Sequence, residues 1–237
     1  MKRAYFHFAT LVLASLGSLS GLNACAREPV EPLRVAAAEK PAAALSKWQA
    51  GTNYALLPAP QPTNVKPGKV EVNEVFWYGC GHCYTLDPML ESWKQNKPAY
   101  IEFVRTPVMW GPVHQQHAKI YYTLQALNRG DLHPKVFDAI HKDHNMLAAE
   151  KDADARALHL AFFKAHGIAE KDFSTAYDSM TVATNLQRAY DATYRYNVRS
   201  VPLMIVNGKY TTDVGMAGGT GTLLNLVNDL AASEKKP

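Results

Sequence analysis

The stretch "FWYGCGHCYTLDP", from Phe76 to Pro88, decides the fold and poses the main chemical question of the chain. It holds Cys80 and Cys83, with only Gly81 and His82 between them. Such a pair can bind a metal, staple the chain, anchor a haem or act as a redox couple. The residues on either side separate these four uses.

A strand–helix–strand pattern surrounds the motif. The segment Lys69–Gly79 first alternates between polar and apolar residues and then ends in a continuous apolar run, which is typical of a buried central strand. Helical spacing follows Cys80, and Ala99–Val108 indicates a second strand. This order predicts two parallel strands joined by a right-handed crossover.

The remainder of the chain completes the fold prediction. From about His114 to Asn197 the pattern indicates four or five amphipathic helices and no strand. Leu203–Val206 then predicts a strand, and Asn207-Gly208 predicts a two-residue hairpin turn into Lys209–Thr212. We therefore expect an α/β protein, in which a central mixed sheet flanked by helices is interrupted by an inserted all-helical domain.

Some details of the helical block and its neighbours are open to test. Asp152 is expected to cap the helix that follows it. Three tyrosines with helical spacing are expected in the core, namely Tyr190, Tyr194 and Tyr196. "FWY" before the cysteines and "VMWGPV" at 108–113 predict either an apolar groove for unfolded chains or ordinary core and loop packing.

The first residues predict export. Lys2 and Arg3 precede an apolar stretch from Phe6 to about Leu19, which is too short to span a bilayer as a mature helix. "LNAC" then resembles a bacterial lipobox, in which cleavage precedes Cys25 and the cysteine is lipidated. Ordinary cleavage after Ala26 is the alternative.

These signals divide the chain into four parts. Residues 1–24 are expected to be a signal peptide, and 25–50 a disordered tether rich in Ala, Pro and Glu. Residues 51–112 and 190–237 are expected to form the sheet domain, with the helical insertion at 113–189. The formal net charge of +4 loses two with the signal peptide, so nothing indicates a nucleic-acid partner.

The surroundings of the two cysteines favour a redox couple. A zinc site needs about four ligands, and the chain has no second cysteine pair. The histidines that could be offered as ligands are expected to be surface or core residues: His114, His117, His133, His141 and His144. Tyr84 stands where a haem-binding histidine would follow Cys83, and a two-residue loop restrains the unfolded chain too little for a staple.

The expected chemistry assigns different roles to the two thiols. Cys80 opens a helix, where unpaired backbone N–H groups and the helix dipole favour the thiolate. His82, as a cation or hydrogen-bond donor, is expected to stabilise that thiolate further. Cys83, one turn later, is expected to face inward and act as the resolving thiol. Stabilising the reduced form in this way makes the disulfide more oxidising.

At this point the sequence resembles a known family. "FWYGCGHC" after a strand, Val201-Pro202 before a strand and "VNGKY" after it resemble the DsbA family of periplasmic thiol oxidases, within the thioredoxin superfamily. The resemblance covers about Tyr54 to Leu230. It implies a cis peptide bond at Val201-Pro202, with the Val201 backbone pairing with substrate. It also implies that Glu74 is a buried acid assisting proton transfer at Cys83, unless it is a solvent-facing strand residue.

The family also implies a function. It predicts a monomeric, periplasmic oxidoreductase that donates its disulfide to exported proteins as they fold, and the lipobox-like "LNAC" adds a lipid anchor at Cys25 to this expectation. A quinone-linked membrane partner similar to DsbB would reoxidise it, and no metal or cofactor beyond the Cys80–Cys83 disulfide is expected. A disulfide isomerase or reductase on the same fold is one alternative, and a non-catalytic chaperone or metal-binding module is another.

Gly81 is the one departure from the family pattern, because the best-known members have proline there. Protein disulfide isomerase has glycine at the corresponding place. The expected reduction potential therefore lies between about −180 mV, the value for the isomerase, and about −120 mV, the value for DsbA.

Overall fold

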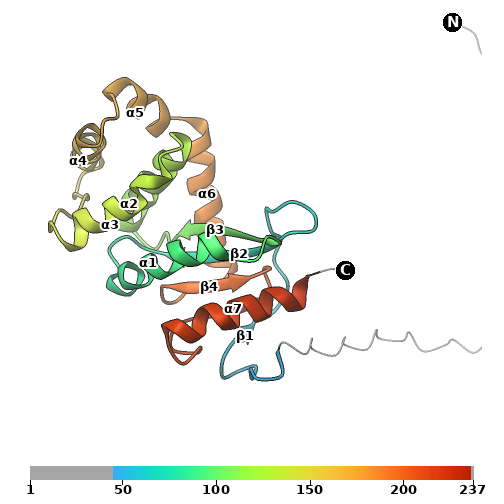
Figure 1. The fold of residues 1–237 in the computed structure, drawn as a ribbon. Helices are drawn as coiled ribbons and strands as arrows, with labels where there is room; N and C mark the ends of the chain where they lie inside the picture. Colours follow the sequence, from blue (N-terminus) through green and yellow to red (C-terminus); the bar gives the residue numbers. More distant parts are fainter. Residues whose placement is uncertain (1–44, 236–237) are drawn as a thin grey trace, which may run out of the picture. The chain divides into compact units, whose positions relative to one another are not determined.

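The computed structural model describes residues 45–235. The predicted signal peptide, Cys25 and the tether as far as residue 44 lie outside the described residues. Within the described part, a five-stranded mixed sheet is flanked by helices, and a block of helices is inserted between two of its strands (Figure 1). None of the helices at 45–235 has the length and apolarity that crossing a bilayer requires.

The sheet has the strand order β1-β5-β4-β2-β3. The central strand β2 (Val70–Phe76) pairs in parallel with β3 (Ile101–Pro107) and antiparallel with β4 (Leu203–Val206). Helix α1 (Gly81–Asn96) connects β2 to β3, as the strand–helix–strand pattern predicts. The remaining strands complete the far edge: β5 (Tyr210–Thr212) and β1 (Ala55–Leu56). The sequence did not predict β1, because two residues carry no period.

Strand β2 is buried along its whole length, including its polar residues Glu71, Asn73 and Glu74. Val70 and Val72 contribute to a core with α1 and α7 (Thr220–Glu234), which includes Leu90 and Leu226. On the opposite face, Val75 packs with Ala192 near the end of α6. Burial on both faces is the physical basis of its central position.

The helical insertion consists of five α-helices and a short 3-10 turn at Gly130–Leu132. The helices are α2 (Pro112–Ala126), α3 (His133–His141), α4 (Asp152–Ala165), α5 (Glu170–Tyr177) and α6 (Met180–Arg195). Figure 1 shows α6 running from this block to the sheet, past the expected boundary at 189. The core of the insertion is continuous with Phe76 and Tyr78, so it reaches the segment that carries the cysteines.

Two expectations for the helical block are wrong. Tyr190 and Tyr194 are 41% and 61% exposed and lie against each other on the surface of α6, whereas Tyr196 is buried. Helical spacing alone could not separate them, because the face of α6 toward the core is lined by smaller residues. Asp152 is the first helical residue and does not cap α4; its carboxylate accepts a hydrogen bond from Gln116 instead.

Residues 45–50, at the end of the expected tether, pack against the sheet domain. Leu45 is buried in the core beside α7, and the Trp48 indole donates a 2.8 Å hydrogen bond to Asp229 on that helix. The composition of the tether hid this, because only two large apolar residues near its end make the contact. The predicted hairpin is confirmed: Asn207 and Gly208 both have positive φ, as a type I′ turn requires.

Candidate active site

Cys80 lies where β2 passes into α1. It is the N-cap residue of α1, and its sulfur accepts a 3.4 Å hydrogen bond from the backbone N–H of Cys83. Gly79 precedes it because the Trp77 indole folds back over this position, where a Cβ atom would overlap the ring. The local sequence therefore combines a tight turn with the positive end of a helix.

The environment of Cys80 favours its thiolate. Both cysteines are free thiols, and Cys80 is half-buried. A hydrogen bond from the Cys83 side chain makes the largest contribution and lowers the pKa of Cys80 to about 6, although partial burial opposes it. The backbone N–H groups of Cys83 and His82 and the charge of His82 add to the effect. His82 is exposed, and its influence comes after that of Cys83.

Cys83 lies behind Cys80 and is fully buried. Burial raises the pKa of the Cys83 thiol far above its usual value, and the hydrogen bond to Cys80 and the negative charge of Glu74 raise it further. One thiol is thus accessible and easily ionised, while the other is enclosed and holds its proton.

A loop distant in sequence completes the site. The Val201–Pro202 peptide bond is cis, the geometry that the resemblance implies. The Cys80 thiol lies 3.4 Å from the carbonyl oxygen of Val201 and donates to it. Val201 is partly exposed and Pro202 is buried, so the backbone beside the reactive sulfur is accessible on one side.

Aromatic side chains surround this loop and the start of α1. The "FWY" triplet separates: Phe76 and Tyr78 are core residues, and Trp77 is only partly covered. Trp110 is 42% exposed, and its indole donates to the carbonyl of Val198, just before the cis-proline loop. The His114 ring lies between the indoles of Trp77 and Trp110. This surface combines exposed apolar side chains with an indole that is held in place by a hydrogen bond.

A buried charge cluster lies on the inner side of the site. Glu74 is 1% exposed, so it is not a solvent-facing strand residue. Arg105 of β3 donates to three carboxylates, at 2.7 Å to Glu74, 2.9 Å to Asp87 and 2.7 Å to Glu91. Burial raises the pKa of Glu74 to about 7, against the attraction of Arg105, and the charges of Asp87 and Glu91 raise it further.

The helical insertion holds the segment before Cys80. The hydroxyl of Tyr78 and Nδ1 of His133 share a 2.7 Å hydrogen bond, and Nε2 of His141 donates to the Tyr78 carbonyl at 2.8 Å. Nε2 of His133 also lies 3.2 Å from Asp87, without the alignment of a hydrogen bond. Burial lowers the pKa of His133 to about 4, so the ring is neutral there.

Sequence reasoning missed Arg105, Asp87 and Glu91, and it considered His133 only as a surface or core residue or a metal ligand. A signal existed for Arg105, because it is a charged residue that directly follows the apolar pair Phe103-Val104 inside a predicted strand. Of the histidines weighed as metal ligands, His117 and His133 are buried, and their rings are hydrogen-bonded to the Met146 carbonyl and the Tyr78 hydroxyl. Within residues 45–235, no three acidic, histidine or cysteine side chains are grouped so as to hold a metal ion.

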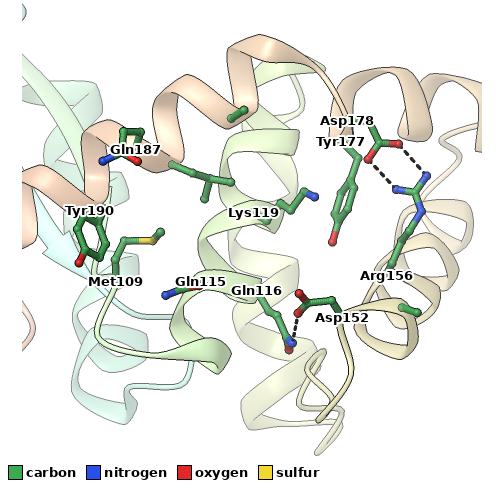
Figure 2. Close-up of a pocket in the computed structure, with 13 residues that line it drawn as sticks. Met109, Gln115, Gln116, Lys119, Asp152, Arg156, Tyr177, Asp178, Gln187 and Tyr190 are labelled. Carbon is green, nitrogen blue, oxygen red and sulfur yellow. Dashed lines mark hydrogen bonds and ion pairs between the residues drawn. The ribbon is translucent and has the colours of Figure 1, made fainter.

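One cavity lies away from the cysteines. It measures about 790 Å³ and lies between helices of the insertion, next to Lys119 and the Arg156–Asp178 ion pair (Figure 2). None of its lining residues is among those that surround the cysteines. Cys80 therefore lies on a partly exposed surface at the start of α1, apart from this cavity.

Comparisons with known proteins agree with this geometry. No family model matches the chain. The chain is 37% identical over 196 residues to the thiol:disulfide interchange protein DsbA of Pseudomonas aeruginosa, covering 82% of this chain and 89% of that protein. It is 34% identical to the Pseudomonas syringae protein of the same name, covering 96% and 94%. The crystal structure of Pseudomonas aeruginosa DsbA superposes with a TM-score of 0.72 at 36% identity, over 79% of this chain and 94% of that one.

Proposed function

The chain belongs to the DsbA family of thiol:disulfide interchange proteins and is a protein disulfide oxidoreductase, and from this premise we propose that Cys80 and Cys83 carry the disulfide it transfers to exported proteins. The observation that carries the proposal is the asymmetry of the two thiols. The pKa of Cys80 is lowered to about 6 and that of Cys83 is raised.

The first step opens the enzyme disulfide. A substrate thiolate attacks the sulfur of Cys80, an S–S bond forms between them, and the Cys80–Cys83 bond breaks. The electron pair goes to Cys83, which is buried and needs a proton. Glu74 is the proposed donor, because its pKa of about 7 leaves it partly protonated near neutral pH.

The second step releases the product. A second substrate thiolate attacks the substrate sulfur of the mixed disulfide, and Cys80 leaves as a thiolate. The substrate loses two electrons and the enzyme disulfide gains them. Cys80 is a good leaving group because low thiol pKa speeds departure. The N-cap hydrogen bond from Cys83 N–H stabilises the same thiolate.

Substrate would bind across the surface beside Cys80. We assign the Val201 carbonyl and the adjoining cis-proline loop to the extended backbone of the substrate, since that carbonyl already lies 3.4 Å from the reactive sulfur. Exposed Trp110 and Val113 supply apolar contact for an unfolded chain. Such contact is tolerant of sequence, which suits an enzyme with many substrates.

The cellular setting is part of the proposal. The signal sequence supports export to the periplasm, and the lipobox-like "LNAC" supports a membrane anchor at Cys25. A quinone-linked membrane protein similar to DsbB would restore the disulfide, and the enzyme would act as a monomer without metal. Mass spectrometry of membrane fractions tests the anchor: an unlipidated N-terminus after Ala26 would exclude it.

The test of the activity uses a reduced, unfolded secretory protein as substrate. The oxidised enzyme should form the disulfides of the substrate, with the loss of one enzyme disulfide for each substrate disulfide formed. The C80S variant should form none. The equilibrium with glutathione separates an oxidase from the alternative reductase on the same fold. A potential near about −270 mV, that of thioredoxin, would contradict the oxidase.

A further inference from the structure

Arg105 is shared by three carboxylates, and the three differ in exposure. The side chains of Glu74 and Asp87 are buried, whereas that of Glu91 is 30% exposed. Each N–H direction of the guanidinium serves a different partner: Nε faces Glu74, Nη2 faces Asp87 and Nη1 faces Glu91. A single positive charge is thus divided among three negative ones.

Glu91 remains charged in this arrangement. Burial opposes its ionisation, but the hydrogen bond and charge of Arg105, together with Lys94, outweigh burial and hold the pKa of Glu91 below its usual range. Its two oxygens have separate cations, since Oε1 accepts from Arg105 at 2.7 Å and Oε2 lies 3.3 Å from Lys94. A fixed negative charge therefore stands at the outer end of the cluster.

We propose that Glu91 is a positioning residue of the redox site. It binds Arg105 from the solvent side and shares the positive charge of Arg105 with Glu74, so that the proton of the cluster stays on Glu74, beside Cys83. The inference rests on the proposed role of Glu74 as proton donor. Glu91 acts on the redox site indirectly, through its hydrogen bond to Arg105 and through the repulsion between its charge and that of Glu74.

The physical reason is competition for one cation. Were Arg105 paired with Glu74 alone, the ion pair would favour the charged carboxylate, which cannot give a proton to Cys83. Two further carboxylates weaken that effect and add like-charge repulsion, so Glu74 gains by taking up a proton. Glu91 is the member best placed to be altered, because its partial exposure lets a neutral replacement remain solvated.

Several other titratable or charged groups face the same cluster, and the test must leave them unchanged. They are Cys83, Asp87 and Lys94 on α1, Arg105 on β3, Tyr78 before Cys80, Tyr121 on α2 and His133 on α3. Of these, Arg105 and Lys94 are the cations. Glu91→Gln changes one charge and leaves all of them in place, and the glutamine oxygen can still accept the Arg105 hydrogen bond.

The experiment titrates Glu74 directly in the reduced, full-length protein. Glutamate carboxyl carbons are labelled with ¹³C, and the Glu74 signal is assigned with E74Q. The wild-type midpoint is expected near pH 7. In E91Q it should fall by roughly one pH unit, which is a tenfold loss of proton affinity. Opening of the enzyme disulfide by a small dithiol should slow several-fold at pH 7.5.

Two controls make the result specific. Glu102→Gln alters the same residue type on β3, three residues before Arg105 and therefore on the other face of the strand, so it should not move the midpoint. Lys94→Gln removes the surface cation next to Glu91 and should shift the midpoint upward by less than E91Q shifts it downward, because an exposed charge is screened.

Each outcome decides the point. An E91Q midpoint that is unchanged or raised, in folded protein, overturns the inference. A wild-type Glu74 that titrates near the ordinary glutamate value overturns both the inference and the donor role of Glu74. If E91Q lowers the midpoint but the wild-type protein fails to oxidise substrate, the proposed function is overturned and the effect of Glu91 on Glu74 stands.

Discussion

Cys80 and Cys83 are one helical turn apart, yet the regions around them differ in almost every respect. Cys80 meets backbone N–H groups, a helix start and an accessible surface. Cys83 meets a closed core and the negative end of a charge cluster. The difference shows how one short motif yields two unlike thiols. Backbone N–H groups stabilise the thiolate of Cys80, whereas burial and the charge of Glu74 disfavour the thiolate of Cys83.

The largest effect should come from removing the thiols one at a time. Cys80→Ser should reduce substrate oxidation to the uncatalysed rate, because the accessible nucleophile and leaving group is gone. Cys83→Ser should still form a mixed disulfide through Cys80 but not resolve it. Non-reducing gels and mass spectrometry would detect the trapped species. A trapped mixed disulfide in C80S instead would reverse the assignment of the two roles.

The buried side of the comparison should dominate stability. Arg105→Met leaves three carboxylates without their cation and should cost about 3–5 kcal/mol of unfolding free energy, as is typical when one partner of a buried pair is lost. Urea unfolding at pH 7 measures it. Arg129→Met, which breaks the exposed pair with Asp131, is the matched control and should leave the midpoint nearly unchanged. Equal losses of unfolding free energy in the two variants would show that the buried cluster contributes no more to stability than an exposed ion pair.

The exposed side should dominate reactivity. Alkylation of Cys80 by iodoacetamide should rise about tenfold per pH unit up to about pH 6 and then level, because only the thiolate reacts. Cys83→Ala removes the hydrogen bond that contributes most to this shift and should move the midpoint toward the ordinary value of about 8.5. An unchanged midpoint in C83A would show that the helix start and His82, rather than Cys83, lower the pKa of Cys80.

The same shift has a consequence for stability. The pKa of Cys80 is about 6 in the folded reduced protein, below its value in the unfolded chain. The resulting stability is present above the unfolded pKa of about 8.5 and is lost as pH falls through about 6. The reduced form should therefore gain stability over the oxidised form between these values. Thermal unfolding of both forms from pH 5 to 9 tests this, and a constant difference would contradict it.

The smallest change should come from Gly81. It is the first helical residue of α1, where proline is favoured, and a Cβ atom there would meet nothing within 4 Å. Gly81→Pro should leave the fold intact and make the disulfide more oxidising by at most about 60 mV, the span between the isomerase and DsbA values. A glutathione equilibrium measures it, and a shift in the reducing direction would contradict the expectation.

The parts of the site that are local in sequence could be predicted, and the parts made by side chains meeting across elements could not. The cysteine pair, the strand before it and the proline before β4 each carry a pattern within a few residues. Arg105 and Glu91 are separated by 14 positions, and their meeting depends on how α1 lies on β3. No periodicity encodes that distance.

The fold shows the same division. The hairpin at Asn207 and Gly208 follows from two residues, and its positive φ angles are local chemistry. Tyr190 and Tyr194 have helical spacing that suits a core, but their exposure depends on which face of α6 the remaining helices cover. Leu45 and Trp48 are similar: a short segment is ordered only because α7 lies beside it.

The position of β2 between a parallel and an antiparallel neighbour has a consequence for how this protein can vary. Side chains alternate along the strand, so a slip of one residue would turn Glu74 toward α6 and bring Asn73 beneath Cys83. Hydrogen bonding from both sides resists such a slip. Insertions and deletions should therefore be tolerated in exposed loops such as 66–68, and a change of even one residue in length between Val70 and Cys80 should abolish the activity while the core remains well packed.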